Sequence, residues 1–216
     1  MSKQIAVIGL GKFGTNLCIQ LAKEGAQVLA IDVDEKPVRK LSEVVAQAII
    51  ADTSDEDVAK ELKLDKFDDV VVSIGSDIKA SILVSIILKE AGVKKIWVKT
   101  KDSLHMKVLE KIGVDFIINP ERDMAIRISE QLLFNHLIDF VHLKDDISIY
   151  ELAVPEKCVT ETIKSLEIDP DLHILAIKRE KQLITAVTED TMLEVRDVLI
   201  LAGDKLKLQE SIARVA

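Results

Sequence analysis

The stretch IAVIGLGKFG, residues 5–14, decides the fold, because it joins an apolar run to three glycines in the spacing G-x-G-x-x-G. The residues that follow, Thr15 to Glu24, are compatible with a helix. In this order of strand, glycine turn and helix, Gly9 permits a tight turn, Gly11 lets a pyrophosphate approach the backbone, and Gly14 lets the helix pack closely on the strand. The free N–H groups at the helix N-terminus favour a phosphate. The stretch therefore predicts a nucleotide or dinucleotide site, and a tight turn without a ligand remains the alternative.

A second apolar run, Gln27 to Ile31, predicts another strand, which ends at Asp32. A carboxylate in this place accepts hydrogen bonds from the hydroxyls of an adenosine ribose, and its charge repels a 2′-phosphate. The pattern therefore favours NAD(H) or adenosine nucleotides over NADP(H).

Apolar runs and helical patterns alternate through the first 138 residues. Repeated strand–helix units with short joints predict an α/β fold, a Rossmann-type doubly wound parallel sheet of about six strands. The further strands are expected at Ala48 to Ala51, Val70 to Ile74, Ile96 to Lys99 and Phe116 to Asn119, and the helices at Asp34 to Glu43, Asp55 to Leu62, Asp77 to Ala91 and Ser103 to Lys111.

Ligands of such a sheet bind at the carboxyl ends of its strands, so the functional side chains are sought there. Within the glycine loop, Lys12 is unusual because the backbone already neutralises a pyrophosphate, and a lysine could reach a further phosphate such as that of ATP; the alternative is a lysine that points to solvent. The predicted binding residues are Gly9, Gly11, Lys12, Phe13, Gly14, Asp32, Asp52, Thr53, Ser73, Ile74, Gly75 and Lys99.

The last third of the chain has a different pattern. A helix is expected from Pro120 towards Leu137; its apolar residues 132–134 would either cover the sheet or pack across a dimer. After Asp139 the apolar residues alternate with period two, which predicts a small, mainly antiparallel α+β domain. The boundary is placed at 138/139, in a connecting segment of residues 136–145. Expected strands are 147–154, 172–177, 183–187 and 198–201, and expected helices are Thr160 to Leu166 and Lys205 to Ala213.

Composition excludes several classes of protein. A net charge of −8 and seven aromatic residues disfavour binding to nucleic acid. No uncharged apolar stretch reaches the length of about 20 residues that a membrane span needs, so direct membrane insertion is not expected. The first predicted strand follows Met1 so closely that a signal peptide has no room, which favours a cytoplasmic location. Cys18 and Cys158 match no redox or zinc pattern.

A catalytic apparatus is hard to find in this sequence. The single tyrosine, Tyr150, is followed four residues later by Val154, whereas short-chain dehydrogenases have Tyr-x-x-x-Lys. The four histidines are scattered and are expected at the surface or at helix ends, and no nucleophile elbow is present. The chain is therefore expected to bind a nucleotide without enzymatic activity, with a Rossmann-type NAD-dependent oxidoreductase as the alternative.

Several segments resemble the RCK family, the regulators of potassium conductance, and in particular the short Ktr/Trk-type subunits of bacterial potassium uptake systems. The resemblance is close from Ile5 to about Phe140 and looser beyond. It rests on residues 6–14, 32–34, 51–53, 73–75, 108–115 and 119–125. It implies a non-enzymatic cytoplasmic subunit that binds ATP/ADP or NAD(H). Homodimers of such subunits assemble to an octameric ring beneath a membrane potassium-translocating subunit, whose pore the ring gates.

The resemblance also implies roles for particular residues. The three glycines match the phosphate loop, Asp32 the ribose acid, and Asp52 with residues 73–75 the adenosine pocket. Glu121 matches a carboxylate that approaches the γ-phosphate region of the neighbouring subunit, where Mg²⁺ or Ca²⁺ can participate. Lys12 departs from the arginine that is frequent in the Ktr branch, and the loss of the planar fork weakens bidentate phosphate recognition.

In many relatives the small domain binds cyclic di-AMP, a doubly anionic ligand. The corresponding loop of this chain contains Glu167, Asp169 and Asp171. Three acids disfavour an anion, since anion recognition uses basic groups. Cyclic di-AMP is therefore not expected at this loop.

Overall fold

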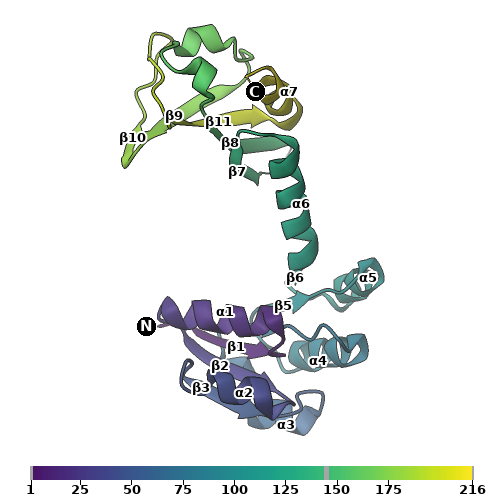
Figure 1. The fold of residues 1–216 in the computed structure, drawn as a ribbon. Coiled ribbons are helices and arrows are strands. Elements are labelled where there is room, and N and C mark those ends of the chain that lie inside the picture. Colours follow the sequence, from purple (N-terminus) through teal and green to yellow (C-terminus); the bar gives the residue numbers. More distant parts are fainter. Residues whose placement is uncertain (1, 144–145, 216) are drawn as a thin grey trace. The chain divides into compact units, whose positions relative to one another are not determined.

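The computed structural model describes residues 2–143 and 146–215. Its internal contacts divide the chain into two compact units, residues 1–120 and 121–216. Figure 1 shows the elements of both units along the chain.

The first unit is built on a six-stranded parallel sheet in the order β3-β2-β1-β4-β5-β6. The central strand β1 pairs with β2 on one side, where Ile8 lies opposite Ile31, and with β4 on the other, where Ile8 lies opposite Val72. The predicted Rossmann-type sheet is confirmed. Its strands are β1 (Gln4–Ile8), β2 (Gln27–Asp32), β3 (Gln47–Ile50), β4 (Asp69–Val72), β5 (Ile96–Lys99) and β6 (Phe116–Ile118).

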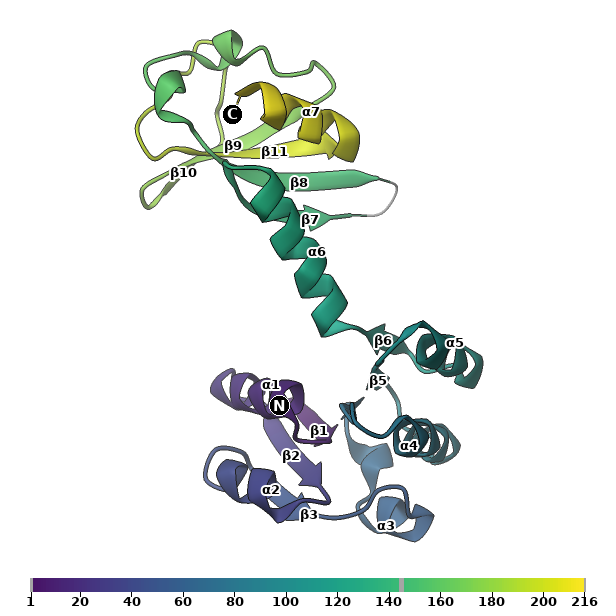
Figure 2. The ribbon, with the colours of Figure 1, turned by 45° about the vertical axis from the view of Figure 1, so that its right-hand side comes forward.

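Helices cover both faces of this sheet, as Figure 2 shows. Helices α1 (Lys12–Lys23) and α2 (Glu35–Leu41) pack on one face, where Cys18 and Leu41 join the core. The opposite face is covered by α3 (Glu56–Glu61), α4 (Ile78–Glu90) and α5 (Ser103–Ile112), together with the short 3-10 helix η1 (Leu64–Lys66). Because both faces are covered, the central strands are apolar apart from their ends, as at residues 5–8 of β1 and 70–72 of β4.

The second unit is an antiparallel sheet of five strands in the order β10-β9-β11-β8-β7, accompanied by two helices. Tyr150, Ile177 and Leu201 are fully buried in its core. The elements are α6 (Pro120–Leu133), β7 (Leu137–His142), β8 (Ile147–Ala153), η2 (Glu156–Cys158), η3 (Ile163–Leu166), β9 (His173–Arg179), β10 (Gln182–Ile184), β11 (Val198–Asp204) and α7 (Lys205–Val215).

Strand β7 corrects the sequence prediction, which placed a connecting segment at residues 136–145. The alternation of this strand is interrupted by a register shift between Leu137 and Asp139, so its pattern with period two is not visible in the sequence. The helix expected at 160–166 is also shorter, because Thr160 has a φ of 71° and only Ile163–Leu166 turns as a 3-10 helix.

The contacts of α6 place this helix with the second unit. Its Arg127 bonds Asp139 at 2.5 Å, and Gln131 donates to the carbonyl of Ile138 at 2.5 Å. The sequence put the domain boundary at 138/139, after this helix, whereas the contacts divide the chain before it. The difference arises because helical periodicity does not show which sheet a helix bonds.

None of the helices formed by residues 2–143 and 146–215 is long and apolar enough to cross a membrane.

Candidate nucleotide-binding site

The glycine loop joins β1 to α1, and two of its three glycines are required by the fold itself. Gly9 has a φ of +91°, and a Cβ there would lie 2.9 Å from the carbonyl carbon of Ser73. A Cβ on Gly14 would lie 2.0 Å from the carbonyl oxygen of Gly9. A Cβ on Gly11, in contrast, would meet no atom within 4 Å. The chain itself therefore does not require a glycine at position 11, but the close approach of a ligand to the backbone does.

The N-terminus of α1 is open. Helices α2, α3, α4 and α5 each begin after an aspartate whose carboxylate accepts a backbone N–H, but the N-cap of α1 is Gly11, which has no side chain. The first N–H groups of α1 are thus not capped by a side chain, and its positive dipole end favours an anion. Lys12 is exposed in this first turn and Phe13 is half-buried.

Asp32 lies at the end of β2, beside the loop. One carboxylate oxygen accepts the N–H of Leu10 at 2.5 Å, and the other accepts the N–H of Asp34 at 2.9 Å. The backbone thus fixes the carboxylate, and each oxygen keeps a second lone pair for a ribose hydroxyl.

The end of β3 contributes Asp52 and Thr53. Asp52 accepts bonds from the backbone N–H and the hydroxyl of Ser54, at 3.0 and 2.6 Å, and these bonds lower the pKa of its carboxyl group. Asp52 is exposed and ionised at neutral pH, whereas Thr53 is buried.

The end of β4 supplies a buried hydroxyl. Ser73 is 5% exposed, and its Oγ has no hydrogen-bond partner in the part of the chain that the structure describes. It lies beside the glycine loop, 3.2 Å from the position of a Cβ on Gly14. A buried polar atom without a partner costs about 1–3 kcal/mol. A water or ligand at the loop would satisfy this hydroxyl.

A lysine from β5 lies near the same loop. The Nζ of Lys99 is 5.9 Å from the centre of the Phe13 ring, within the range of a cation–π contact. It is also 3.8 Å from the position of a Cβ on Gly75, which follows the half-buried Ile74. The structure thus brings together Phe13, Gly75 and Lys99, which the sequence named separately.

His105 is a residue of this region that sequence reasoning missed. The histidines were expected at the surface or at helix ends; His105 does lie in the first turn of α5, but its burial, at 2% exposed, was not foreseen. Its Nδ1 accepts the N–H of Lys101 at 3.3 Å, and its Nε2 has no hydrogen-bond partner among the described residues. Burial lowers the pKa of His105 despite the nearby charge of Asp102, so the ring is neutral and Nε2–H is a donor. The sequence could have pointed to His105 only through its position shortly after the carboxyl end of β5.

Glu121 belongs to the second unit, whereas the residues above belong to the first. It lies in the first turn of α6 and is exposed. Among the side chains that the structure describes, no three of the His, Cys, Asp and Glu type come together as a metal site.

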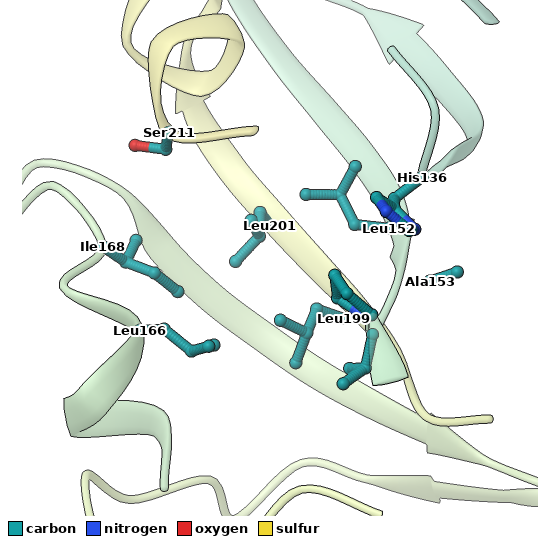
Figure 3. Close-up of a pocket in the computed structure, with 10 residues that line it drawn as sticks. His136, Leu152, Ala153, Leu166, Ile168, Leu199, Leu201 and Ser211 are labelled. Carbon is teal, nitrogen blue, oxygen red and sulfur yellow. The ribbon is translucent and has the colours of Figure 1, made fainter. Parts of the chain in front are cut away.

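The second unit has a pocket of different character, shown in Figure 3. Leu152, Leu199 and Leu201 give it an apolar lining, to which His136 and Ser211 add polar atoms. Nearby, Lys207 pairs with Asp171 and lies 3.6 Å from Asp169. Two of the three acids that argue against cyclic di-AMP are therefore paired with a lysine.

Fold and loop geometry define the first unit as a Rossmann-type domain with an open phosphate loop. The model of the TrkA-N domain matches residues 5–120, more than half of the chain. The chain belongs to the TrkA-N family, and it is similar over nearly its whole length to proteins of Ktr potassium uptake systems.

Three similar proteins illustrate this family. Ktr system potassium uptake protein C of Bacillus subtilis is 42% identical over 94% of this chain and 93% of its own length. Ktr system potassium uptake protein A of Vibrio alginolyticus is 41% identical over 95% and 94%. The GsuK channel superposes on the whole chain with a TM-score of 0.70 at 16% identity; this chain spans 40% of its length, and the likeness shows the fold.

Proposed function

We propose that this protein is a regulatory subunit of a potassium uptake system, which binds ATP/ADP or NAD(H) in its first unit and gates a membrane potassium-translocating subunit. The observation that carries the proposal is the open space at Gly11 beside the uncapped start of α1, with Asp32 fixed at the end of the next strand. These features fit a phosphate and a ribose at their usual spacing.

Particular residues would divide the work of binding. The backbone at Gly9, Gly11 and Gly14 would bind the phosphates, and Asp32 the ribose. The adenosine would lie against the ends of β3 and β4, at Asp52, Thr53, Ser73, Ile74 and Gly75. The phosphates would face Lys12, Lys99 and the edge of Phe13. His105 would donate a hydrogen bond from Nε2 to the nucleotide.

The relatives support both parts of the proposal. The two Ktr proteins named above are called potassium uptake proteins and are similar over nearly their whole lengths. A structure of the GsuK channel is described as bound to NAD, and another as bound to ADP. Because the similar Ktr proteins are named as potassium uptake proteins and not as enzymes, we propose regulation without catalysis.

Assembly is the second element of the proposal. Met124, Ile126 and Ile128 are exposed on α6, and Leu132 and Leu133 at its end are 77% and 75% exposed. A helix with this much uncovered apolar surface fits a contact with another copy. We propose a homodimer that assembles to an octameric ring at the inner, cytoplasmic face of the membrane, without inserting into it. Mg²⁺ or Ca²⁺ would bind between Glu121 and the phosphates held by a neighbouring copy.

Co-purification and transport would test the proposal. The chain is co-expressed with the membrane subunit of a Ktr system, and potassium flux into vesicles is measured with ATP, ADP, NADH or no nucleotide. We expect the complex to form and the flux to depend on which nucleotide is present. Hydride transfer from NADH to a small substrate, with no effect on flux, would instead support the oxidoreductase.

A further inference from the structure

Helix α6 buries a carboxylate while apolar side chains beside it remain exposed. Glu130 is only 7% exposed, whereas Ile126 and Leu133 are 41% and 75% exposed. Residues at i−4 and i+3 lie next to residue i on a helix, so this apolar pair flanks Glu130 on one side. The hydrophobic effect alone would therefore turn α6 about its axis, to bury the apolar pair and to expose the carboxylate.

Bonds from three other elements hold Glu130 inside the second unit. Its Oε1 accepts from Lys205 Nζ of α7 at 3.0 Å and lies 3.1 Å from His142 Nε2 of β7. Its Oε2 accepts the hydroxyl of Tyr150 of β8 at 3.2 Å. Burial alone would raise the pKa of Glu130, but the hydrogen bonds with Lys205 and His142 hold that pKa below its usual range, so the carboxylate is ionised at neutral pH. Because these partners surround one point, they are satisfied by one rotation of α6.

Two exposed bonds agree with this rotation but are too weak to impose it. Arg127 pairs with Asp139, and Gln131 donates to the carbonyl of Ile138. At about 100° per residue, Arg127 and Gln131 lie on the flank of Glu130 away from the apolar pair. Pairs exposed to water contribute little. The buried carboxylate is therefore the contact that decides the rotation.

A buried ion of this kind adds little net stability, because desolvation offsets its attraction to its partners. Its best-attested use is to fix register, as one buried polar residue does in a coiled coil at a cost in stability. In α6 the quantity to be fixed is the rotation about the helix axis, since an apolar alternative lies only about 50° away.

We propose that Glu130 is a positioning residue, which fixes the rotation of α6 on the second unit and thereby directs one face of the helix towards another copy of the chain. Ile128 and Leu132, two positions before and after Glu130, point about 160° away from it, and Glu121, nine positions before, about 180° away. Ile128 and Leu132 are 46% and 77% exposed. The inference rests on the proposed assembly through α6 and adds the residue that orients the contact.

Spin labels on the full-length protein measure this rotation. Cysteines replace Ala125 of α6 and Lys178 of β9, which are both exposed, and the distance distribution within one chain is recorded after dilution with unlabelled copies. Protein without the added cysteines gives the background from the buried Cys18 and Cys158. A roll of about 50° moves a group at the helix surface by about 5 Å.

The test variant combines Glu130→Leu with Lys205→Met, so that no ammonium is left without its anion. We expect one narrow distribution in the wild type, and a distribution that broadens or shifts by up to about 5 Å in the variant. Ser129→Leu adds a leucine to an exposed position of α6 outside the cluster and should behave as the wild type. A narrow, unshifted distribution in the double variant would overturn the proposal. If that variant does not melt cooperatively, Glu130→Gln decides by the same two outcomes, because it keeps the size of the side chain without its charge.

Sedimentation provides the second arm and separates this inference from the proposed assembly. If the correct rotation falls to about a tenth of the molecules, the Kd of self-association should rise about tenfold. A double variant with an altered distance distribution but the self-association of the wild type would show that the rotation does not direct the contact. A wild type that stays monomeric would contradict the proposed assembly, whereas the distances would still decide what Glu130 does to α6.

Discussion

Gly11→Asp separates the stability of the fold from the binding of a nucleotide. Gly11 has a φ of −64° and a ψ of −169°, which other residues adopt without strain, and a Cβ there meets no atom within 4 Å. Aspartate is also a preferred N-cap, and its charge suits the start of a helix. Without nucleotide the variant should therefore be as stable as the wild type or more stable by about 0.5–1 kcal/mol.

With nucleotide the same variant should behave in the opposite way. A ligand at 100 times its Kd stabilises a protein by about 2.7 kcal/mol. For a chain of this size, about 1 kcal/mol corresponds to 2–4 °C in Tm, so the wild type should gain roughly 5–11 °C. The aspartate side chain occupies the phosphate approach and repels the phosphate, so Gly11→Asp should gain almost nothing.

Thermal shift with ATP, ADP and NADH measures both effects. Gln20→Glu is the matched control, because it adds the same charge to an exposed position of α1 away from the loop. The control should keep the full rise in Tm. A Gly11→Asp protein that shows the full rise with ATP and NADH would refute the assignment of the phosphate site.

Asp32→Ala should weaken NADH and ATP together by about tenfold or more, because both present the same ribose edge; calorimetry that finds unchanged affinities would place the adenosine elsewhere. Lys12→Ala should narrow the preference for ATP over ADP, by roughly 10- to 150-fold if a charge-assisted bond of about 1.5–3 kcal/mol to the γ-phosphate is lost, while NADH titrations stay the same. Glu121→Gln should reduce the effect of Mg²⁺ or Ca²⁺ on ATP-dependent assembly, and sedimentation in chelator and in Mg²⁺ would contradict this if the variant responded like the wild type. Arg179→Met should destabilise the second unit by about 3–5 kcal/mol at pH 7, because it removes the cation that pairs with the fully buried Asp197 and leaves that carboxylate only the backbone N–H of Glu194. Burial would raise the pKa of Asp197, but the bonds of Arg179 hold it low, so this difference should shrink in acid melts as pH falls below about 4, where the unfolded carboxylate is protonated.

The sequence by itself determined the layout of the first unit. Parallel strands that are covered on both faces appear in the sequence as apolar runs. Helices α2 to α5 each begin after an aspartate N-cap, which is a local signal; these residues are Asp34, Asp55, Asp77 and Asp102. The glycine spacing and Asp32 also lie within one strand–helix–strand unit, where short-range chemistry defines the geometry.

Tertiary structure decided what depends on residues far apart in the chain. Only the packed backbone shows that Gly9 and Gly14 are required by the fold while Gly11 is open, and that Lys99 lies near Phe13. The buried state of His105 likewise appears only once α5 packs on the sheet.

The second unit depended on tertiary structure still more. Its edge strand β7 is irregular, and Glu130 reads in the sequence as one more charged residue of a helix, although it is buried and residues 121–129 before it are all exposed. Its burial follows from contacts with Lys205, 75 positions away, and with His142 and Tyr150. Periodicity reports the face of a helix or strand, but only the closed chain shows which side chains meet across elements, because those contacts have no pattern along the sequence.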